Sequence, residues 1–417
     1  MAAQSPGFTS ASGIYNSSET PPAFPWNTYN FCNAPHVNAA HYELPPQAVA
    51  AGPGAAQLLH VSVVMRHHKR TLGPPGGAAW DCASAIQLTY DLGGKAIAHA
   101  ATTPAQHPFA RAMWRGTCDA GQLTPGGLRD AARHGKDLWE LYHARLGLVS
   151  APRPRPDEVW VRTSTEDRTM QVAGAMLAAM GAGNGRGASV GRVHAAVIDS
   201  LVPAYACPTA NAVRDAFEAV PAWTAHLQEN APLKARLDAV FGTAGLDAWA
   251  SWYDHFFDAL TARTCNGHPL PCSGDGSSCV SEADAASVFA IGDFEYDYIW
   301  HAAQNASMYT SLTFGAFFAE LADALAAPTF GHRLALYVGH DGTLVRLLAG
   351  LGAVPLRWPA FGAEVVFEVW GVVGVRFVRV LYEGTVIGGL EWVRLAEFVD
   401  QLRALVPDRL FERCMGD

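Results

Sequence analysis

Three apolar runs along the chain have the length of buried β-strands. They cover residues 58–65, 157–163 and 332–338, and the first is rich in β-branched side chains. Each run gives way abruptly to charged or imidazole side chains. Because the carboxyl ends of parallel strands lie along one rim of an α/β sheet, where ligands bind, the pattern predicts that the three strand ends contribute to one site.

Much of the remaining pattern is helical. Thr124 suits an N-cap and Pro125 the first helical turn, which predicts a helix from 125 to about 146. Other helices are predicted at about 165–180, 210–228, 231–240, 245–263, 283–303, 306–326, from the His340-Asp341 loop to about 351, and at 392–405. Two late strands are predicted at about 363–369 and 375–382.

Two regions lack regular periodicity. Residues 1–54 are rich in Pro, Ser, Asn and Gly, which predicts a tail whose second half, around Trp26 and Phe31, is pinned to the body. Residues 75–122 predict loops and short strands, including one at 85–90.

Composition excludes several classes of protein. The chain has 417 residues, of which 50% are hydrophobic, so one large domain or two ordinary ones can each bury a core. The net charge of −9, without a long basic run, makes nucleic acid an unexpected partner. No run of 18 apolar residues occurs, so no transmembrane segment is expected.

The cysteines indicate an oxidising compartment. Their number is even and no Cys-x-x-Cys occurs, which favours disulfides over a zinc site. The sequons at Asn16 and Asn305 are glycosylation candidates and agree with a secreted protein or one of the secretory pathway. The first 22 residues do not form a signal peptide, and the cysteines favour a missing signal segment over an intracellular protein. The disulfide candidates are Cys32, Cys82, Cys118, Cys207, Cys265, Cys272, Cys279 and Cys414.

One motif is misleading. Residues 187–191 match the G-x-S-x-G of serine hydrolases, which requires a strand directly before it and a helix directly after it. A predicted helix and a Gly-rich loop precede it here, so we interpret 181–191 as a surface loop.

The three strand ends carry the chemistry. Residues 66–70 read Arg-His-His-Lys-Arg, and such a cluster after a buried strand is costly to keep together without an anion. The second strand leads into Arg162 and the third into His340-Asp341. Taken singly, each group is explained by a solvated turn or a surface salt bridge. Their succession after three strands favours an anion site.

At these residues the chain resembles the histidine acid phosphatases, branch 2 of the histidine phosphatase superfamily. The signature Arg-His-Gly-x-Arg-x-Pro is matched by Arg66, His67 and Arg70, an Arg-Ser-Thr-like segment by VRTSTEDRT, and a later His-Asp pair by His340-Asp341. The resemblance covers roughly residues 55–414. His68 and Leu72 replace the signature's Gly and Pro. These two departures affect the shape of the loop and therefore the range of substrates.

The resemblance implies a fold and a domain order. The expected class is α/β, a three-layer α/β/α core with a mainly parallel central sheet (phosphoglycerate mutase-like) and an inserted helical cap domain. The core would comprise 55–185 and 330–417, the cap 186–329, and residues 1–54 a tail packed on the core.

The resemblance also implies a reaction, the hydrolysis of small phosphate monoesters through a phosphohistidine. His67 would be the nucleophile and Asp341 the general acid, so activity should peak on the acid side of neutrality. Arg66, Arg70 and Arg162 would clamp the phosphate oxygens, because guanidinium groups bind phosphate bidentately, and His340 would donate a further hydrogen bond. Arg168 is assigned a bracing role first and a ligand role second. The scheme needs neither a metal nor a cofactor.

Two alternatives remain. One is a non-catalytic phospho-ligand-binding protein in which His68 and Leu72 have spoiled the loop, although His67 and Asp341 are intact. The other is a phosphotransferase or mutase, against which the long helical block and the cysteines argue. Gly342-Thr343 follows the His-Asp pair where phytases have Thr-Asn, so phytate is not the expected substrate. Lys69 is either solvated or favours a polyanionic substrate.

Overall fold

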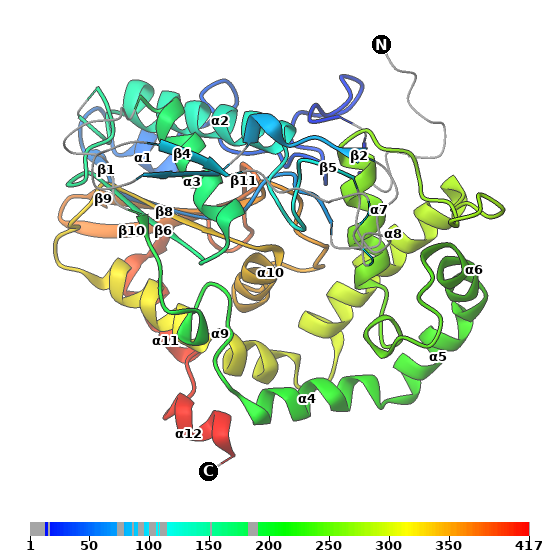
Figure 1. Cartoon of the computed structure of the whole chain (residues 1–417). Coiled ribbons are helices and arrows are strands. Elements are labelled where there is room, and N and C mark those ends of the chain that lie inside the picture. The colour runs from blue at the N-terminus through cyan, green and yellow to red at the C-terminus, as the bar shows by residue number, and fades with distance from the viewer. Residues whose placement is uncertain are drawn as a thin grey trace.

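The computed structural model describes residues 13–15, 17–72, 79–85, 87–90, 96–99, 106, 108, 115–150, 152–181 and 191–416. Its centre is an eight-stranded sheet with helices on both faces and a largely helical unit to one side (Figure 1). The strands lie in the order β11-β10-β9-β1-β8-β6-β7, and β12 pairs with β10. Their bounds are β1 (Ala56–Arg66), β6 (Val159–Thr163), β7 (Gly191–Arg192), β8 (Leu334–Gly339), β9 (Glu364–Val372), β10 (Val375–Tyr382), β11 (Thr385–Val386) and β12 (Val393–Arg394).

The parallel part of the sheet holds the three strands that lead into charged segments. β8 lies between β1 and β6 and runs parallel to both, and β7 continues the parallel part beyond β6. On the other side of β1, β9 and β10 are antiparallel neighbours. The predicted α/β class with a mainly parallel centre is therefore confirmed, with an antiparallel extension made by the late strands.

Alternation along the buried strands separates two apolar layers. Val61, Val63 and Met65 of β1 belong to one buried cluster and Val64 to the other, as expected when successive side chains point to opposite faces. Helices α2 (Pro125–Trp139) and α3 (Asp167–Ala179) supply the first cluster, and α9 (Ala306–Ala326), α10 (Asp341–Gly350) and α11 (Leu395–Ala404) supply the second. The two helical layers lie on opposite sides of the sheet in Figure 1.

The helical unit is more broken than the sequence pattern predicts. The single helix predicted at 210–228 is two, because Pro221 holds the preceding Val220 in an extended conformation and starts a new helix. The helix predicted at 245–263 begins only at Asp254, after a short 3-10 turn. The unit contains α4 (Pro208–Glu218), α5 (Pro221–Glu229), α6 (Ala231–Phe241), a 3-10 turn (Asp247–Trp249), α7 (Asp254–Cys265), α8 (Glu282–Asp297) and a π-helical turn (Tyr298–Ala302).

Shorter elements complete the described chain. α2 is followed by a π-helical turn (Glu140–Arg145), and a C-terminal helix α12 (Leu410–Met415) was not predicted. β2 (Ala79–Trp80) pairs with β5 (Arg115–Gly116), and β3 (Gln87–Tyr90) with β4 (Ala96–His99). The remaining short helices are α1 (Pro46–Ala50), Ala83–Ala85 and Ala196–Ile198. Within the described part of the chain, every helix is too short or too polar to cross a lipid bilayer.

All eight cysteines are paired, as expected. The disulfides are Cys32–Cys265, Cys82–Cys118, Cys207–Cys414 and Cys272–Cys279. The first joins the N-terminal segment to the end of α7, and the third joins the start of α4 to α12. Asn305 is exposed at the start of α9, whereas Asn16 and residues 187–190 of the G-x-S-x-G match lie outside the described residues.

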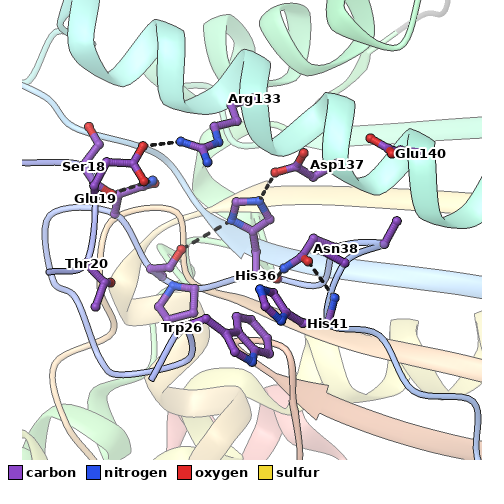
Figure 2. Close-up of a pocket in the computed structure, with 15 residues that line it drawn as sticks. Ser18, Glu19, Thr20, Trp26, His36, Asn38, His41, Arg133, Asp137 and Glu140 are labelled. Atoms are coloured by element: carbon purple, nitrogen blue, oxygen red, sulfur yellow. Dashed lines mark hydrogen bonds and ion pairs between the residues drawn. The ribbon is translucent and has the colours of Figure 1, made fainter. Parts of the chain in front are cut away.

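The N-terminal segment lies across α2. Glu19 forms an ion pair with Arg133, and His36 Nε2 lies 2.9 Å from Asp137 Oδ2, both visible at the pocket in Figure 2. Trp26 stacks on His41 at a ring distance of 4.5 Å. These contacts, with fully buried Phe31, anchor the segment to the body.

Candidate active site

The strand register places the predicted groups on one rim. Arg66 at the end of β1 is paired with Gly339 at the end of β8, so His67 and His340 follow at the same level. His67 N donates to Gly339 O at 3.0 Å, and Ser164 N, just after β6, donates to Val338 O at 3.2 Å. All three strand ends therefore meet, as expected for parallel strands.

His67 is held as a neutral imidazole with a defined tautomer. Its Nδ1 lies 2.9 Å from the carbonyl oxygen of His68, which only accepts, so Nδ1 carries the hydrogen and Nε2 keeps its lone pair. Burial lowers the pKa of His67 well below its usual value, and the nearby charge of Arg168 lowers it further. The side chain consequently keeps a nucleophilic nitrogen in acidic solution.

Fully buried Arg66 and partly exposed Asp341 form an ion pair at the rim. Arg66 Nη2 lies 3.1 Å from Asp341 Oδ2, and its Nη1 donates to Pro359 O at 2.5 Å. The Arg66 guanidinium carbon lies 4.3 Å from the centre of the Phe361 ring, a cation–π distance.

Asp341 is ionised in this arrangement. Burial raises its pKa, but the Arg66 charge, a hydrogen bond from Trp358 Nε1 at 2.8 Å and the Arg70 charge together hold that pKa well below its ordinary value. The other carboxylate oxygen accepts from the Gly342 amide at 2.8 Å.

Arg70 pairs with a residue of the helical unit. Its two terminal nitrogens contact the carboxylate oxygens of Asp258 in α7 at 2.8 and 3.1 Å. This bidentate pair links the first strand's loop to α7 and neutralises part of the charge of the basic cluster. Lys69 turns to α2 instead, where its Nζ lies 2.8 Å from Asp130 Oδ2.

Arg162 is not brought into this group. It lies inside β6 two residues after Trp160, so its side chain points to the same face of the strand as that of Trp160, the face covered by α9. Its guanidinium is fully buried and bonds to Asp199 at 2.8 Å, to Ser200 and His194 at 2.9 Å each, and to Glu320 of α9. These partners account for its charge without a ligand.

Arg168 occupies the position expected of Arg162. Its Nη2 lies 3.4 Å from His340 Nδ1, and its Nη1 is 2.8 Å from Glu166. Among charged neighbours, it contributes most to the lowered pKa of both His67 and His340. The sequence assigned Arg168 a bracing role first and a ligand role second, and its position beside the two histidines favours the ligand role.

His340 faces His67 edge-on, with ring centres 5.2 Å apart. Its Nε2 lies 2.9 Å from Ser164 Oγ, and its Nδ1 faces Arg168, which only donates. Nδ1 is thus an acceptor and the hydrogen lies on Nε2. Burial, reinforced by Arg168, lowers the pKa of His340 to about 3.

The arginines keep unused donors at the rim. The Nε atoms of Arg66, Arg70 and Arg168 are buried and have no hydrogen-bond partner within the described structure, and the same holds for the Nε of Arg162 away from the rim. Buried donors are normally satisfied, so the nitrogens at the rim suit an anion that presents several oxygens. No group of three or more His, Cys, Asp or Glu side chains among the described residues is arranged to hold a metal ion.

Sequence reasoning missed two contacts of this rim, those of Asp258 and Trp358. Both residues lie in segments without a recognised motif, Asp258 in α7 and Trp358 in the loop before β9. Arg168 could have been found from the sequence, since it lies in the same VRTSTEDRT segment as Arg162. The two residues that depart from the family signature fit into the structure. His68 lies against Gly362, and Leu72 is 3% exposed within the core.

Two curated relatives are phosphatases. The human testicular acid phosphatase is 26% identical over 349 residues, covering 78% of this chain and 69% of the relative. The zebrafish 2-phosphoxylose phosphatase 1 is 23% identical over 399 residues, covering 86% and 77%.

Solved structures share the fold. The Hafnia alvei phytase in complex with myo-inositol hexakis sulphate aligns with a TM-score of 0.58 at 15% identity, covering 86% of this chain and 99% of that one. The phytase from D. castellii aligns with a TM-score of 0.53 at 15% identity, covering 95% and 90%. The family model described as histidine phosphatase superfamily (branch 2) matches residues 57–383. The chain therefore belongs to branch 2 of the histidine phosphatase superfamily.

Proposed function

We propose that this protein is an acid phosphomonoesterase that acts on small phosphate monoesters through a phosphohistidine on His67. The observation that carries the proposal is the state of His67. Its Nδ1–H is bound to a carbonyl, its Nε2 lone pair is available, and three arginine side chains surround it.

In the first step, His67 Nε2 attacks the phosphorus atom and the bond from phosphorus to the ester oxygen breaks. Arg66, Arg70 and Arg168 stabilise the non-bridging oxygens, since fixed charges are the main source of stabilisation in phosphoryl transfer. Asp341 gives its proton to the leaving oxygen, so an alcohol departs and a carboxylate remains. In the second step, water attacks phosphorus, its proton returns to Asp341, and the nitrogen–phosphorus bond breaks to release phosphate.

The acid role requires Asp341 to gain a proton when substrate binds. Before binding, the Arg66 charge favours the carboxylate. A bound phosphate shares Arg66 and places negative charge near Asp341, and both effects raise the pKa of the carboxyl group. Activity is therefore expected to be highest in acidic solution, where His67 still remains neutral.

The charge balance favours a single phosphate group. Asp258 offsets Arg70, and Asp130 holds Lys69 away from the rim. Few uncompensated positive charges are left for additional phosphates, so Lys69 does not argue for a polyanionic substrate.

The decisive test measures phosphate release from p-nitrophenyl phosphate between about pH 4 and 8 with EDTA present, for the wild type and His67→Ala. We expect acid-peaked turnover that resists EDTA and falls by at least about 10³-fold in the variant. Brief incubation with substrate followed by denaturation should trap an acid-labile phosphate on the wild type only. An inactive wild type would favour the phospho-ligand-binding alternative, and transfer of phosphate to added alcohols in preference to water would favour a phosphotransferase.

A further inference from the structure

Trp358 contacts the proposed general acid directly. Its Nε1–H donates to Asp341 Oδ2 at 2.8 Å, and the side chain is 4% exposed. Trp358 precedes Pro359, whose carbonyl accepts from Arg66. One short segment therefore fixes both members of the Arg66–Asp341 ion pair.

The position of the indole is set by two helices of the helical unit. Phe257 of α7 stacks on it at 4.0 Å with an interplanar angle of 2°, and Tyr296 of α8 stacks at 4.1 Å with an angle of 26°. A Cβ on Gly292 would lie 2.2 Å from the Phe257 ring, so this glycine lets α8 pack closely against α7. The stack leaves the indole little freedom to rotate.

Backbone contacts fix the same residue from another side. The Trp358 carbonyl accepts from Tyr29 OH at 2.8 Å, and its amide donates to Asp293 Oδ1 at 3.3 Å. Tyr29 belongs to the N-terminal segment and Asp293 to α8. Three parts of the chain, α7, α8 and the N-terminal segment, therefore hold Trp358 so that its N–H points at one carboxylate oxygen of Asp341.

We propose that Trp358 is a positioning residue for Asp341, through which α7 and α8 control protonation of the leaving group. The inference rests on the proposed function. When Asp341 gives up its proton it becomes a carboxylate, and a hydrogen bond to a charged acceptor is stronger than one to a neutral acceptor. The indole N–H therefore stabilises the transition state more than the ground state, and does so most when proton transfer is far advanced.

A role of Trp358 in leaving-group protonation predicts that the effect of removing the indole N–H depends on the leaving group of the substrate. An alkoxide is a poor leaving group and needs the proton, whereas p-nitrophenolate departs with little help. Loss of the indole N–H should therefore harm glycerol 2-phosphate more than p-nitrophenyl phosphate. A purely structural role would harm both substrates equally.

The test compares kcat/KM for both substrates in the wild type, Trp358→Phe and Trp252→Phe. Phenylalanine keeps a ring in the stack but removes the donor. Trp252 is the matched control, because its ring lies 6.5 Å from that of Trp358 while its indole does not donate to Asp341. We expect Trp358→Phe to lose about tenfold with glycerol 2-phosphate and less than about threefold with p-nitrophenyl phosphate. Trp252→Phe should change each value by less than about threefold.

The pH profile gives a second readout. Without the N–H donor the carboxylate is less stabilised, so the alkaline limb of kcat/KM should move to higher pH in Trp358→Phe. Phe257→Leu, which keeps the indole and loosens its stack, should show a weaker selective loss and serves if Trp358→Phe does not fold. Equal losses for both substrates, or an unmoved alkaline limb, would overturn the inference. A wild type inactive on both substrates would instead overturn the proposed function.

Discussion

At the residue scale, two arginines six positions apart have different surroundings. Arg162 is surrounded by Asp199, Glu320 and Ser200, whereas Arg168 reaches the imidazole of His340. A strand residue and a residue at the start of the following helix point in unrelated directions. Only the second of these positions lies on the rim where the strand ends meet.

Substitution of the two arginines should separate catalysis from stability. We expect Arg168→Ala to lower kcat/KM by about 10²–10³-fold with little change in unfolding, because it removes a charge beside the transferring phosphoryl group. Arg162→Ala should lower the free energy of unfolding by about 3–5 kcal/mol, because the buried carboxylate of Asp199 would be left without its cation and the partly buried Glu320 would lose its partner. Urea unfolding and kinetics on the folded fraction measure both. If folded Arg162→Ala were as inactive as Arg168→Ala, the assignment of roles would be reversed.

At the scale of elements, the loop after β1 depends on the segment before β9. His68 takes the place of a glycine in the family signature, and its ring fits because Gly362 has no side chain. A Cβ at Gly362 would lie 2.7 Å from His68 Nε2, and the backbone there has a φ of +74°. His68 also approaches His134 of α2 at 3.4 Å, and His134 bonds to Glu364 at 2.9 Å.

This dependence predicts a non-additive pair of substitutions. Gly362→Ala should destabilise by more than Gly374→Ala, which has a similar φ of +77° but open space around it. Gly374→Ala measures the cost of placing an alanine at a positive φ, which is about 1 kcal/mol. The additional loss of unfolding free energy in Gly362→Ala measures the clash with His68.

In the His68→Gly background, the extra cost of Gly362→Ala should disappear. Urea midpoints of the wild type, the two single variants and the double variant complete the cycle. Equal costs of Gly362→Ala in both backgrounds would show that the two residues are not coupled.

At the scale of the whole molecule, folding gathers buried carboxyl groups whose titration affects stability. Glu383 lies in the turn after β10 with a φ of +49° and is 7% exposed. Burial raises its pKa from 4.5 to about 7, although Tyr382 and Arg357 act in the opposite direction and Glu364 adds to the rise. The folded protein therefore binds this proton more tightly than the unfolded chain does.

Because the pKa of Glu383 is higher in the folded protein than in the unfolded chain, Glu383 favours the folded state more in acidic than in neutral solution. Its contribution is fully present below about pH 4.5 and is lost as the pH rises to about 7. Glu383→Gln should remove that decline, which amounts to at most about 3–4 kcal/mol, since one pKa unit corresponds to about 1.4 kcal/mol. Urea unfolding of both proteins at pH 5 and pH 7.5 makes the comparison, in which other titrating groups cancel. Parallel pH dependence in the two proteins would contradict this account.

The sequence by itself determined the local features. Apolar runs located the three parallel strands and placed His67, Asp341 and the charged residues around them at the strand ends, because strand ends and motif spacing are properties of neighbouring residues. Helix ends were less well predicted where a proline such as Pro221 divides a continuous apolar pattern.

Only the tertiary structure decided which charged groups meet. Arg162 is separated from Glu320 by 158 positions and Arg70 from Asp258 by 188, so no local pattern encodes these pairs. Packing in three dimensions also decides that Arg168, and not Arg162, lies beside the histidines, and that the indole N–H of Trp358 donates to Asp341. Burial and the packing of distant segments determine whether a guanidinium is neutralised within the fold or remains available to a substrate.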